Sequence, residues 1–338
     1  MPTWFSTLTG FHESSYASTQ AKLEVVGDTL RSLVNGQSYR IGELETPSLA
    51  DLRARAATLR HQQRVTLRVS EVTGDVAALH SDPANHGALF QVASQFNLLE
   101  TTGPDVAPED GVTRYAVDHT QGPACAMAAG AATIYRNYCV PVHRWPRQRG
   151  QTSSRQIDCL ADMGTALGND TGALWTMRNG YALCTEAGLD RITTKLAAMS
   201  EAERDALRAR LAIGLHWGVQ VTTAGASANQ RVSQALCSAL PVSYTAIPAA
   251  RWQAFATLVL EGAYEATLLA ALLHVHRGGT NRVFLTRLGG GAFGNDAAWI
   301  HHALQRALGL VQGCDLDVRI VSRNTPGADV RSVVGEFA

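Results

Sequence analysis

The sequence lacks the charge patterns that are typical of nucleic-acid or membrane partners. Lys plus Arg and Asp plus Glu each number 29, so the formal net charge is zero, and basic residues form no long run. A neutral chain has no electrostatic reason to bind a polyanion or an anionic membrane surface. We therefore expect no nucleic acid and no membrane among its partners.

Paired cysteines are also missing. The six cysteines lie far apart and form no C-x-x-C pair or Cys/His motif, so we expect neither a metal site nor a cofactor. Such thiols are typical of buried, unpaired cysteines in a reducing compartment. Residues Met1–Gly10 lack the basic and apolar regions of a secretory signal, and a cytoplasmic protein is expected.

The composition is that of a folded α/β protein. Of the 338 residues, 46% are apolar and 17% are charged, which excludes a disordered chain. The most apolar long segment, Phe255–Val275, contains Glu261 and Glu265 and predicts a core helix rather than a membrane span. The length suits two domains or one large α/β domain, and the absence of a clear linker favours one domain with an N-terminal extension.

Residues 1–63 predict that extension, and we expect it to be helical. Ser18–Leu33 has a weak helical period, and Ser48 with Asp51 predicts a capping box at the start of a helix that runs to about Arg60. Alternating apolar residues at Val65–Val69 then predict a strand.

Strands and turns follow along the rest of the chain. Val76–Leu79 and Ala88–Ala93 are apolar runs that predict strands, and Asn179-Gly180 predicts a hairpin with a type I′ turn. From Ser233 onward the order of predicted elements is β-α-β-α-β, which implies parallel strands with right-handed crossovers.

One stretch combines a strand, a glycine loop and a helix. Val283–Leu288 predicts a buried strand, Gly289–Gly291 follow directly, and a helical period begins at Asp296. Free N–H groups in such a loop, with the positive end of the helix dipole, favour a bound phosphate. A tight strand–helix turn without a ligand is the alternative.

A second turn has similar features. Gly122-Pro123 precedes a predicted helix, Ala124–Tyr138, whose first turns consist of small residues that allow close approach of a sheet or ligand. Asp118 lies just before this turn. Two helix N-termini, one of them with a carboxylate beside it, are therefore expected to converge on one ligand.

Four segments together resemble a macrodomain-type family that is distantly related to poly(ADP-ribose) glycohydrolases. They are Gln91–Glu100, Asp118–Ala126, Tyr135–Tyr138 and Leu288–Asn295. One bacterial member removes ADP-ribose from arginine on ubiquitin. The resemblance spans roughly residues 40–325. It implies a macrodomain-like mixed sheet flanked by helices, with residues 64–338 as the catalytic domain, and an ADP-ribosylated protein, for example ubiquitin, as the partner.

The resemblance also implies cleavage of a glycosidic bond at the distal ribose, which requires a carboxylate. Asp118 is the first candidate, Glu100 the second and Asp296 the third; the alternatives are helix caps for both aspartates and a solvated strand end for Glu100. Asn97 is expected to bind the distal ribose unless it forms an Asx-turn, and Phe293 to pack on a ring unless it anchors its loop. The expected binding residues are Asn97, Thr120, Gln121, Gly122, Ala124, Gly289, Gly290, Gly291, Ala292, Phe293, Gly294 and Asn295.

Two other functions remain open at this point. One is a reader that binds ADP-ribose or a related nucleotide without chemistry. The other is a hydrolase in which Cys125 is the nucleophile, at a helix N-terminus, with His119 or His143 as the base.

Overall fold

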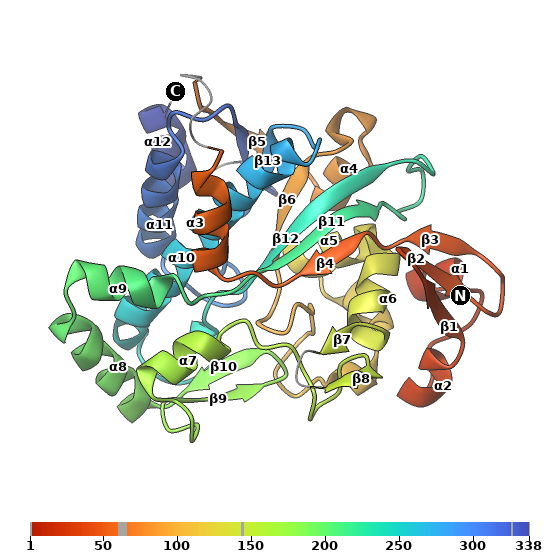
Figure 1. Cartoon of the computed structure of the whole chain (residues 1–338), viewed down its shortest axis with the longest axis horizontal. Helices are drawn as coiled ribbons and strands as arrows, with labels where there is room; N and C mark the ends of the chain where they lie inside the picture. The colour runs from red at the N-terminus through yellow and green to blue at the C-terminus, as the bar shows by residue number, and fades with distance from the viewer. Residues whose placement is uncertain (1, 60–65, 143–144, 326, 338) are drawn as a thin grey trace.

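A seven-stranded mixed sheet forms the centre of the molecule in the computed structural model, which describes residues 2–59, 66–142, 145–325 and 327–337 (Figure 1). The strand order is β4-β11-β12-β6-β13-β14-β5, and β11 is antiparallel to both of its neighbours, whereas the other pairs are parallel. The bounds are β4 (Glu43–Glu45), β11 (Gly214–Gln220), β12 (Arg231–Cys237), β6 (Leu89–Ala93), β13 (Arg282–Leu285), β14 (Asp317–Ser322) and β5 (Arg68–Thr73).

Helices cover both faces of this sheet (Figure 1). One layer contains α3 (Leu49–Ala57), α10 (Ala249–His276), α11 (Ala297–Leu310) and α12 (Ala328–Phe337), and the other contains α4 (Val76–Ser81), α5 (Gln121–Ala128) and α6 (Gly130–Tyr138). The predicted fold class, a mixed α/β sheet flanked by helices, is confirmed, as are the parallel strands expected after Ser233.

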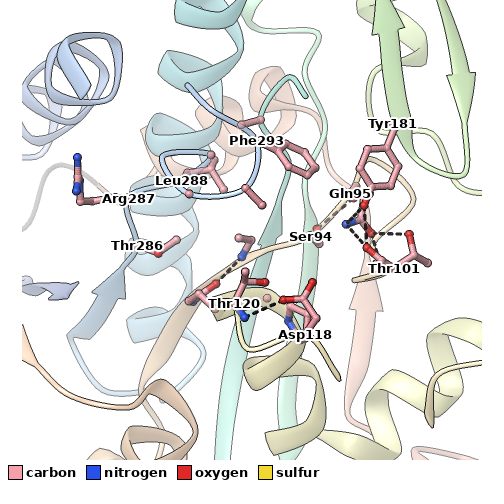
Figure 2. Close-up of a pocket in the computed structure, with 18 of the residues that line it drawn as sticks. Ser94, Gln95, Thr101, Asp118, Thr120, Tyr181, Thr286, Arg287, Leu288 and Phe293 are labelled. Carbon is pink, nitrogen blue, oxygen red and sulfur yellow. Dashed lines mark hydrogen bonds between the residues drawn. The ribbon is translucent and has the colours of Figure 1, made fainter. Parts of the chain in front are cut away.

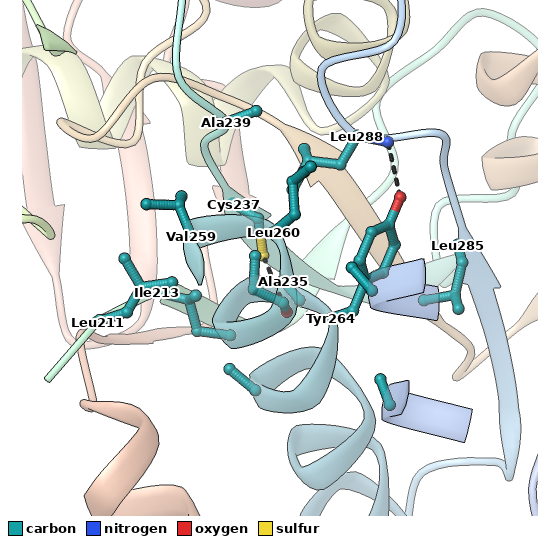
Figure 3. Packing of buried hydrophobic residues seen from close by; sticks show 14 of the residues in the cluster. Leu211, Ile213, Ala235, Cys237, Ala239, Val259, Leu260, Tyr264, Leu285 and Leu288 are labelled. Carbon is teal, nitrogen blue, oxygen red and sulfur yellow. Dashed lines mark hydrogen bonds between the residues drawn. The ribbon is translucent and has the colours of Figure 1, made fainter. Parts of the chain in front are cut away.

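Helix α10 forms the middle of the core. By length and hydropathy it is the one helix of the described residues that could cross a membrane, but 89% of its most apolar window is buried within the protein, which confirms the predicted core helix. Figure 3 shows its Val259, Leu260 and Tyr264 against residues of β12 and β13. The Tyr264 hydroxyl donates to the Thr286 carbonyl at 2.7 Å and accepts from the Leu288 N–H at 2.9 Å, so the core holds the beginning of the glycine loop.

The N-terminal segment is less helical than expected. Most of Ser18–Leu33 forms a hairpin instead of a helix, within a separate three-stranded antiparallel sheet. The alternation of half-buried and exposed residues in Leu23–Val26, together with Gly27 at a φ of 58°, explains this difference. The segment comprises α1 (Trp4–Thr9), α2 (Tyr16–Gln20), β1 (Leu23–Val26), β2 (Thr29–Ser32) and β3 (Ser38–Arg40).

The helix predicted from Ser48 is confirmed, because Ser48 and Asp51 form the expected capping box at the start of α3. Arg60, Val65 and the proposed boundary between residues 63 and 64 lie outside the described residues. The prediction of a strand at Val76–Leu79 is wrong: the Asp75 carboxylate accepts from the N–H groups of Ala77 and Ala78 and starts helix α4 instead.

The single helix predicted for Ala124–Tyr138 is divided at Ala129, where ψ is 52°. The Thr222 hydroxyl accepts from the Gly130 N–H, and the Thr222 N–H donates to the Ala128 carbonyl, so this residue satisfies backbone groups on both sides of the break. The break lets α5 and α6 follow different directions along the sheet.

Smaller elements complete the fold. The predicted hairpin is confirmed, with Asn179 and Gly180 at φ values of 48° and 83° between its strands. The remaining elements are β7 (Pro141–Val142), β8 (Trp145–Arg149), α7 (Ala161–Leu167), β9 (Trp175–Arg178), β10 (Tyr181–Cys184), α8 (Glu186–Ala198) and α9 (Glu201–Arg208).

Replacement of Tyr264 by Phe tests how strongly the core holds the glycine loop. The substitution removes a fully buried hydroxyl and both of its hydrogen bonds, so we expect a loss of about 1–3 kcal/mol in the free energy of unfolding. Urea unfolding measures it. Tyr135→Phe is the control, because its hydroxyl has no hydrogen-bond partner among the described residues; an equal loss in both variants would contradict this role.

Candidate functional site

A cleft lies at the carboxyl ends of the parallel strands β6 and β13 (Figure 2). Ligands of open α/β sheets bind at this edge. The cleft has an empty volume of about 650 Å³, part of it open to solvent. Its lining consists of Ala93, Ser94, Gln95, Thr101, Asp118, Thr120, Gln121, Gly122, Pro123, Tyr181, Ala239, Tyr244, Thr286, Arg287, Leu288, Gly289, Gly291, Ala292 and Phe293. The turn at Gly122 and the glycine loop, far apart in sequence, thus meet at one cleft.

The first wall is the N-terminus of α5. Within the described chain, the N–H groups of Gln121 and Gly122 have no hydrogen-bond partner, as expected for the first turn of a helix. A Cβ on Gly122 would lie 1.9 Å from the Ala93 carbonyl oxygen, so glycine is required here by contact with β6. The Gln121 side chain accepts from the Ala93 N–H and donates to the Gln91 carbonyl, so its amide holds α5 to the sheet.

The second wall is the glycine loop. In the described structure, the N–H groups of Gly289, Gly291, Ala292 and Phe293 make no hydrogen bond, whereas those of the neighbouring loop residues do. The loop is held by Asn295, whose Nδ2 donates to the Leu240 carbonyl at 2.8 Å. The loop therefore offers backbone donors from a fixed conformation, and these suit a bound anion.

Asp118 is the one carboxylate among the described residues that line the cleft. It is half-buried, and its Oδ1 accepts from the Thr120 N–H at 2.8 Å, in an Asx-turn just before α5. No described residue hydrogen-bonds to Oδ2. One oxygen thus fixes the orientation of the carboxylate while the other remains available.

Aromatic side chains close one end of the cleft. The Tyr181 ring lies 5.4 Å from the Phe293 ring and 5.2 Å from the Tyr244 ring, between ring centroids. The Tyr181 hydroxyl donates to the Thr101 carbonyl at 2.7 Å and accepts from the Gln95 amide at 3.2 Å. In Figure 2, Tyr181 and Phe293 lie across the cleft from Asp118, so their rings give a ligand in between an apolar wall.

Glu100 lies behind the cleft rather than in its lining. Its side chain is fully buried, and both carboxylate oxygens accept from Nη2 of the buried Arg136, at 3.2 and 3.3 Å. Burial raises the pKa of Glu100 to about 7, and the Arg136 charge opposes this rise. The alternative of a solvated strand end is therefore wrong, and Glu100, the second catalytic candidate, supports the loop behind the site and does not line the cleft.

Several other expected residues also lie outside the lining. The Asn97 Oδ1 accepts from the Leu99 N–H in the alternative Asx-turn, and the Asp296 Oδ1 accepts from the Ala298 N–H as the alternative helix cap. Helix α11 thus begins beyond the cleft, and the loop before it, not its N-terminus, forms the wall. Ala124, Gly290, Gly294 and Asn295 likewise do not line the cleft.

The geometry disfavours a cysteine nucleophile. Cys125 is fully buried and does not line the cleft, and burial raises the pKa of its thiol well above the usual value, which opposes formation of a thiolate. His119 is exposed, and His143 lies outside the described residues.

Several lining residues approach the cleft from distant segments and were not predicted from the sequence. Ser94, Gln95 and Thr101 follow a predicted strand, and that position was the available signal. Tyr181 and Tyr244 had no local signal, because their place depends on how the hairpin and the segment after β12 fold over the sheet.

Comparisons with known proteins find similarity only among solved structures. Neither a protein-family model nor a curated protein sequence matches the chain. The poly(ADP-ribose) glycohydrolase from Thermomonospora curvata is 14% identical, with a TM-score of 0.47 over 96% of this chain and 98% of that one. The enzyme from Deinococcus radiodurans in complex with ADP-ribose is 14% identical, with a TM-score of 0.45 over 97% and 98% of the two chains. The similarity concerns the overall course of the chain.

A pair of glycine substitutions tests the two walls. Gly122→Ala places a methyl group against the Ala93 carbonyl, so we expect a loss of about 1–3 kcal/mol in stability. Gly291→Ala meets no atom within 4 Å and should leave stability unchanged, which makes it the matched control. Thermal or urea unfolding of both variants measures the difference, and equal stabilities would contradict the close contact of α5 with β6.

Replacement of Glu100 by Gln tests its burial. Between pH 4.5 and about 7 the unfolded state loses the Glu100 proton while the folded state keeps it, so this group stabilises the fold at low pH and the contribution is lost as pH rises. The stability of the wild type relative to Glu100→Gln should therefore fall by about 3 kcal/mol across this range.

Urea unfolding of both proteins at a series of pH values measures this difference. Glu71→Gln, which removes an exposed carboxylate on β5, is the control and should keep the wild-type profile. A difference between wild type and Glu100→Gln that does not vary with pH would show that Glu100 is ionised in the fold.

Proposed function

We propose that this protein is an ADP-ribosyl hydrolase that removes ADP-ribose from a protein side chain. The sequence resemblance favours arginine as that side chain. The observation that carries the proposal is the cleft in which two sets of free N–H groups face one carboxylate, Asp118. A diphosphate needs donors that are fixed in place, and both the N-terminus of α5 and the glycine loop supply them without a cationic side chain. Three of the four resembling segments supply residues to the cleft lining: Gln91–Glu100, Asp118–Ala126 and Leu288–Asn295.

The proposed reaction begins with a water molecule next to the free Oδ2 of Asp118. The carboxylate takes a proton from this water while the oxygen of the water forms a bond to C1″ of the distal ribose. The bond between C1″ and the side-chain nitrogen breaks, that nitrogen takes up a proton from solvent, and Asp118 later returns its proton to solvent. The products are free ADP-ribose and the unmodified side chain. The ring of Phe293, with Tyr181 and Tyr244, would pack against the ribose and hold C1″ near the carboxylate.

A second cavity provides room for the rest of the ligand. Asp118 also lines this cavity, which has an empty volume of about 990 Å³ and is bounded by Asp75, Arg323, Met127 and Trp4, among others. An apolar wall with polar groups at its rim suits a base and its ribose. We place the nucleoside half of ADP-ribose there, with the diphosphate in the cleft between the N-terminus of α5 and the glycine loop.

The direct test uses a protein substrate that carries ADP-ribose on arginine, with free ADP-ribose as the product measured. We expect Asp118→Asn to lower the rate about 100-fold or more, the contribution of a general base, while ADP-ribose affinity stays within a few-fold. Asp296→Asn is the control, because it keeps a good helix cap outside the cleft and should retain activity.

Other outcomes would assign another function. ADP-ribose binding without release from any linkage would favour a reader. Full activity of Asp118→Asn, with loss of activity in Glu100→Gln, would move the catalytic role to the buried carboxylate. Activity that is lost in Cys125→Ser but kept in Asp118→Asn would favour the thiol.

A further inference from the structure

A separate cavity lies at the other end of the strands from the cleft, where β12 begins and α10 ends. Its empty volume is about 1050 Å³, larger than that of the cleft. Its lining includes three arginines from three different elements: Arg40 at the end of β3, Arg231 at the start of β12 and Arg277 after α10. None of these elements contributes a residue near Asp118, so this cavity is independent of the proposed function.

A β-bulge forms one wall of the cavity. The register of β11 against β12 shifts between His216 and Val219, and Gly218, at a φ of 64°, donates its N–H to the Ser233 hydroxyl at 3.0 Å. Because Ser233 accepts that bond, its own hydroxyl proton remains available to a ligand. Bulges of this kind re-aim side chains and are over-represented near sites.

Two of the arginines are held in place by carboxylates. Arg40 pairs with Asp28 at 2.8 Å through Nη2, and Arg277 pairs with Glu43 while its guanidinium lies 5.1 Å from the Trp217 ring centroid. In each pair the guanidinium contacts the carboxylate through Nη2, so other N–H groups of the same side chain remain unused. These two guanidinium groups are therefore fixed in position and still have N–H groups that can donate to a ligand.

Arg231 differs from the other two. No carboxylate of the described chain pairs with its guanidinium, and its known hydrogen bonds are made by the backbone alone. The cavity thus contains three guanidinium groups and two carboxylates, Asp28 and Glu43, an excess of one positive charge. This local excess of positive charge lies in a chain with no net charge, and it lies beside the Ser233 hydroxyl, which accepts from the Gly218 N–H.

We propose that this cavity binds a phosphate group, either inorganic phosphate or the phosphate of a small monoester. Arg231 would supply the uncompensated charge, Arg40 and Arg277 would donate from their fixed positions, and Ser233 would donate its hydroxyl proton. Guanidinium groups suit phosphate because their N–H groups match pairs of phosphate oxygens. The ligand would connect the N-terminal sheet with β12 and α10.

Isothermal titration of the whole protein with inorganic phosphate, in a phosphate-free buffer of low ionic strength, tests the proposal. We expect saturable binding at one site, weakened about tenfold in Arg231→Gln by loss of one charge-assisted contact. Arg231→Lys, which keeps the charge, should lie between the two. Arg191→Gln, on the exposed face of α8 and also without an ion pair in the described structure, is the matched control and should bind as the wild type. A parallel titration with glycerol 3-phosphate shows whether a monoester binds more tightly than the free ion.

ADP-ribose separates this site from the cleft. Phosphate binding that persists at saturating ADP-ribose and depends on Arg231 supports the proposal. Phosphate binding that ADP-ribose abolishes and Arg231→Gln leaves unchanged would place the anion in the cleft and overturn it. Absence of saturable binding to the folded wild type, or equal weakening in Arg191→Gln, would also overturn it. Each of these results is independent of whether Asp118 is catalytic.

Discussion

The candidate site depends on the hydrogen bonds that the buried guanidinium of Arg136 makes. It donates to the Leu98 carbonyl at 2.8 Å, to both oxygens of Glu100 and to the Thr133 hydroxyl at 3.1 Å, with no exposure to solvent. Leu98 has a φ of 64°, which is unfavourable for a residue with a side chain and persists only where surrounding contacts require it. These bonds fix the segment that leads to Thr101 in the cleft. Loss of Arg136 would leave the Leu98 carbonyl and the Glu100 side chain without their donor in the interior, and an unpaired buried polar group costs about 1–3 kcal/mol.

The cleft itself contains little charge, which agrees with the neutral composition. Its donors are backbone N–H groups, and Arg287, the cation at its margin, is already paired with Asp329 at 2.8 Å. Backbone donors are held by the fold and need no further ordering when a ligand binds, which lowers the entropic cost of binding. Each wall therefore depends on structural contacts behind it: Gly122 on the Ala93 carbonyl, and the glycine loop on Tyr264 and Asn295.

The parts of the fold that could be predicted are those specified by local chemistry. The capping box at Ser48, the Asn179-Gly180 turn and the buried strand at Leu89–Ala93 depend on neighbours a few residues away, and all three are confirmed. The meeting of the two glycine turns was also predictable, because parallel strands place their carboxyl ends at one edge. Wrong predictions arose where tertiary contacts decide, as at Ala129, or where a short apolar run has no strong period, as at Val76–Leu79.

A different principle decides which of the candidate residues line the cleft. A carboxylate or amide next to a turn can serve the backbone or a ligand, and sequence alone does not say which. Asn97 and Asp296 each bond to an N–H two residues later and lie outside the lining, whereas Asp118 makes the same kind of bond and still lines the cleft. The difference is the position of the turn relative to the sheet edge, which only the assembled fold determines.

The two ends of the strands in the central sheet are chemically different, and the difference follows from the topology of the sheet. At the carboxyl ends of β6 and β13, the N-terminus of α5 and the glycine loop present N–H groups that have no partner among the described residues, so this end of the strands offers neutral donors and room for one acid. At the opposite end, β12 begins beside the end of α10, where helix carbonyls carry partial negative charge and favour cationic side chains such as Arg277. Arg40 and Arg231 line the same cavity, where Asp28 and Glu43 pair with Arg40 and Arg277 and the charge of Arg231 has no paired carboxylate among the described residues. One sheet thus presents a backbone-lined cleft at one end of its strands and a guanidinium-lined cavity at the other, and an anion would be held by different groups in each.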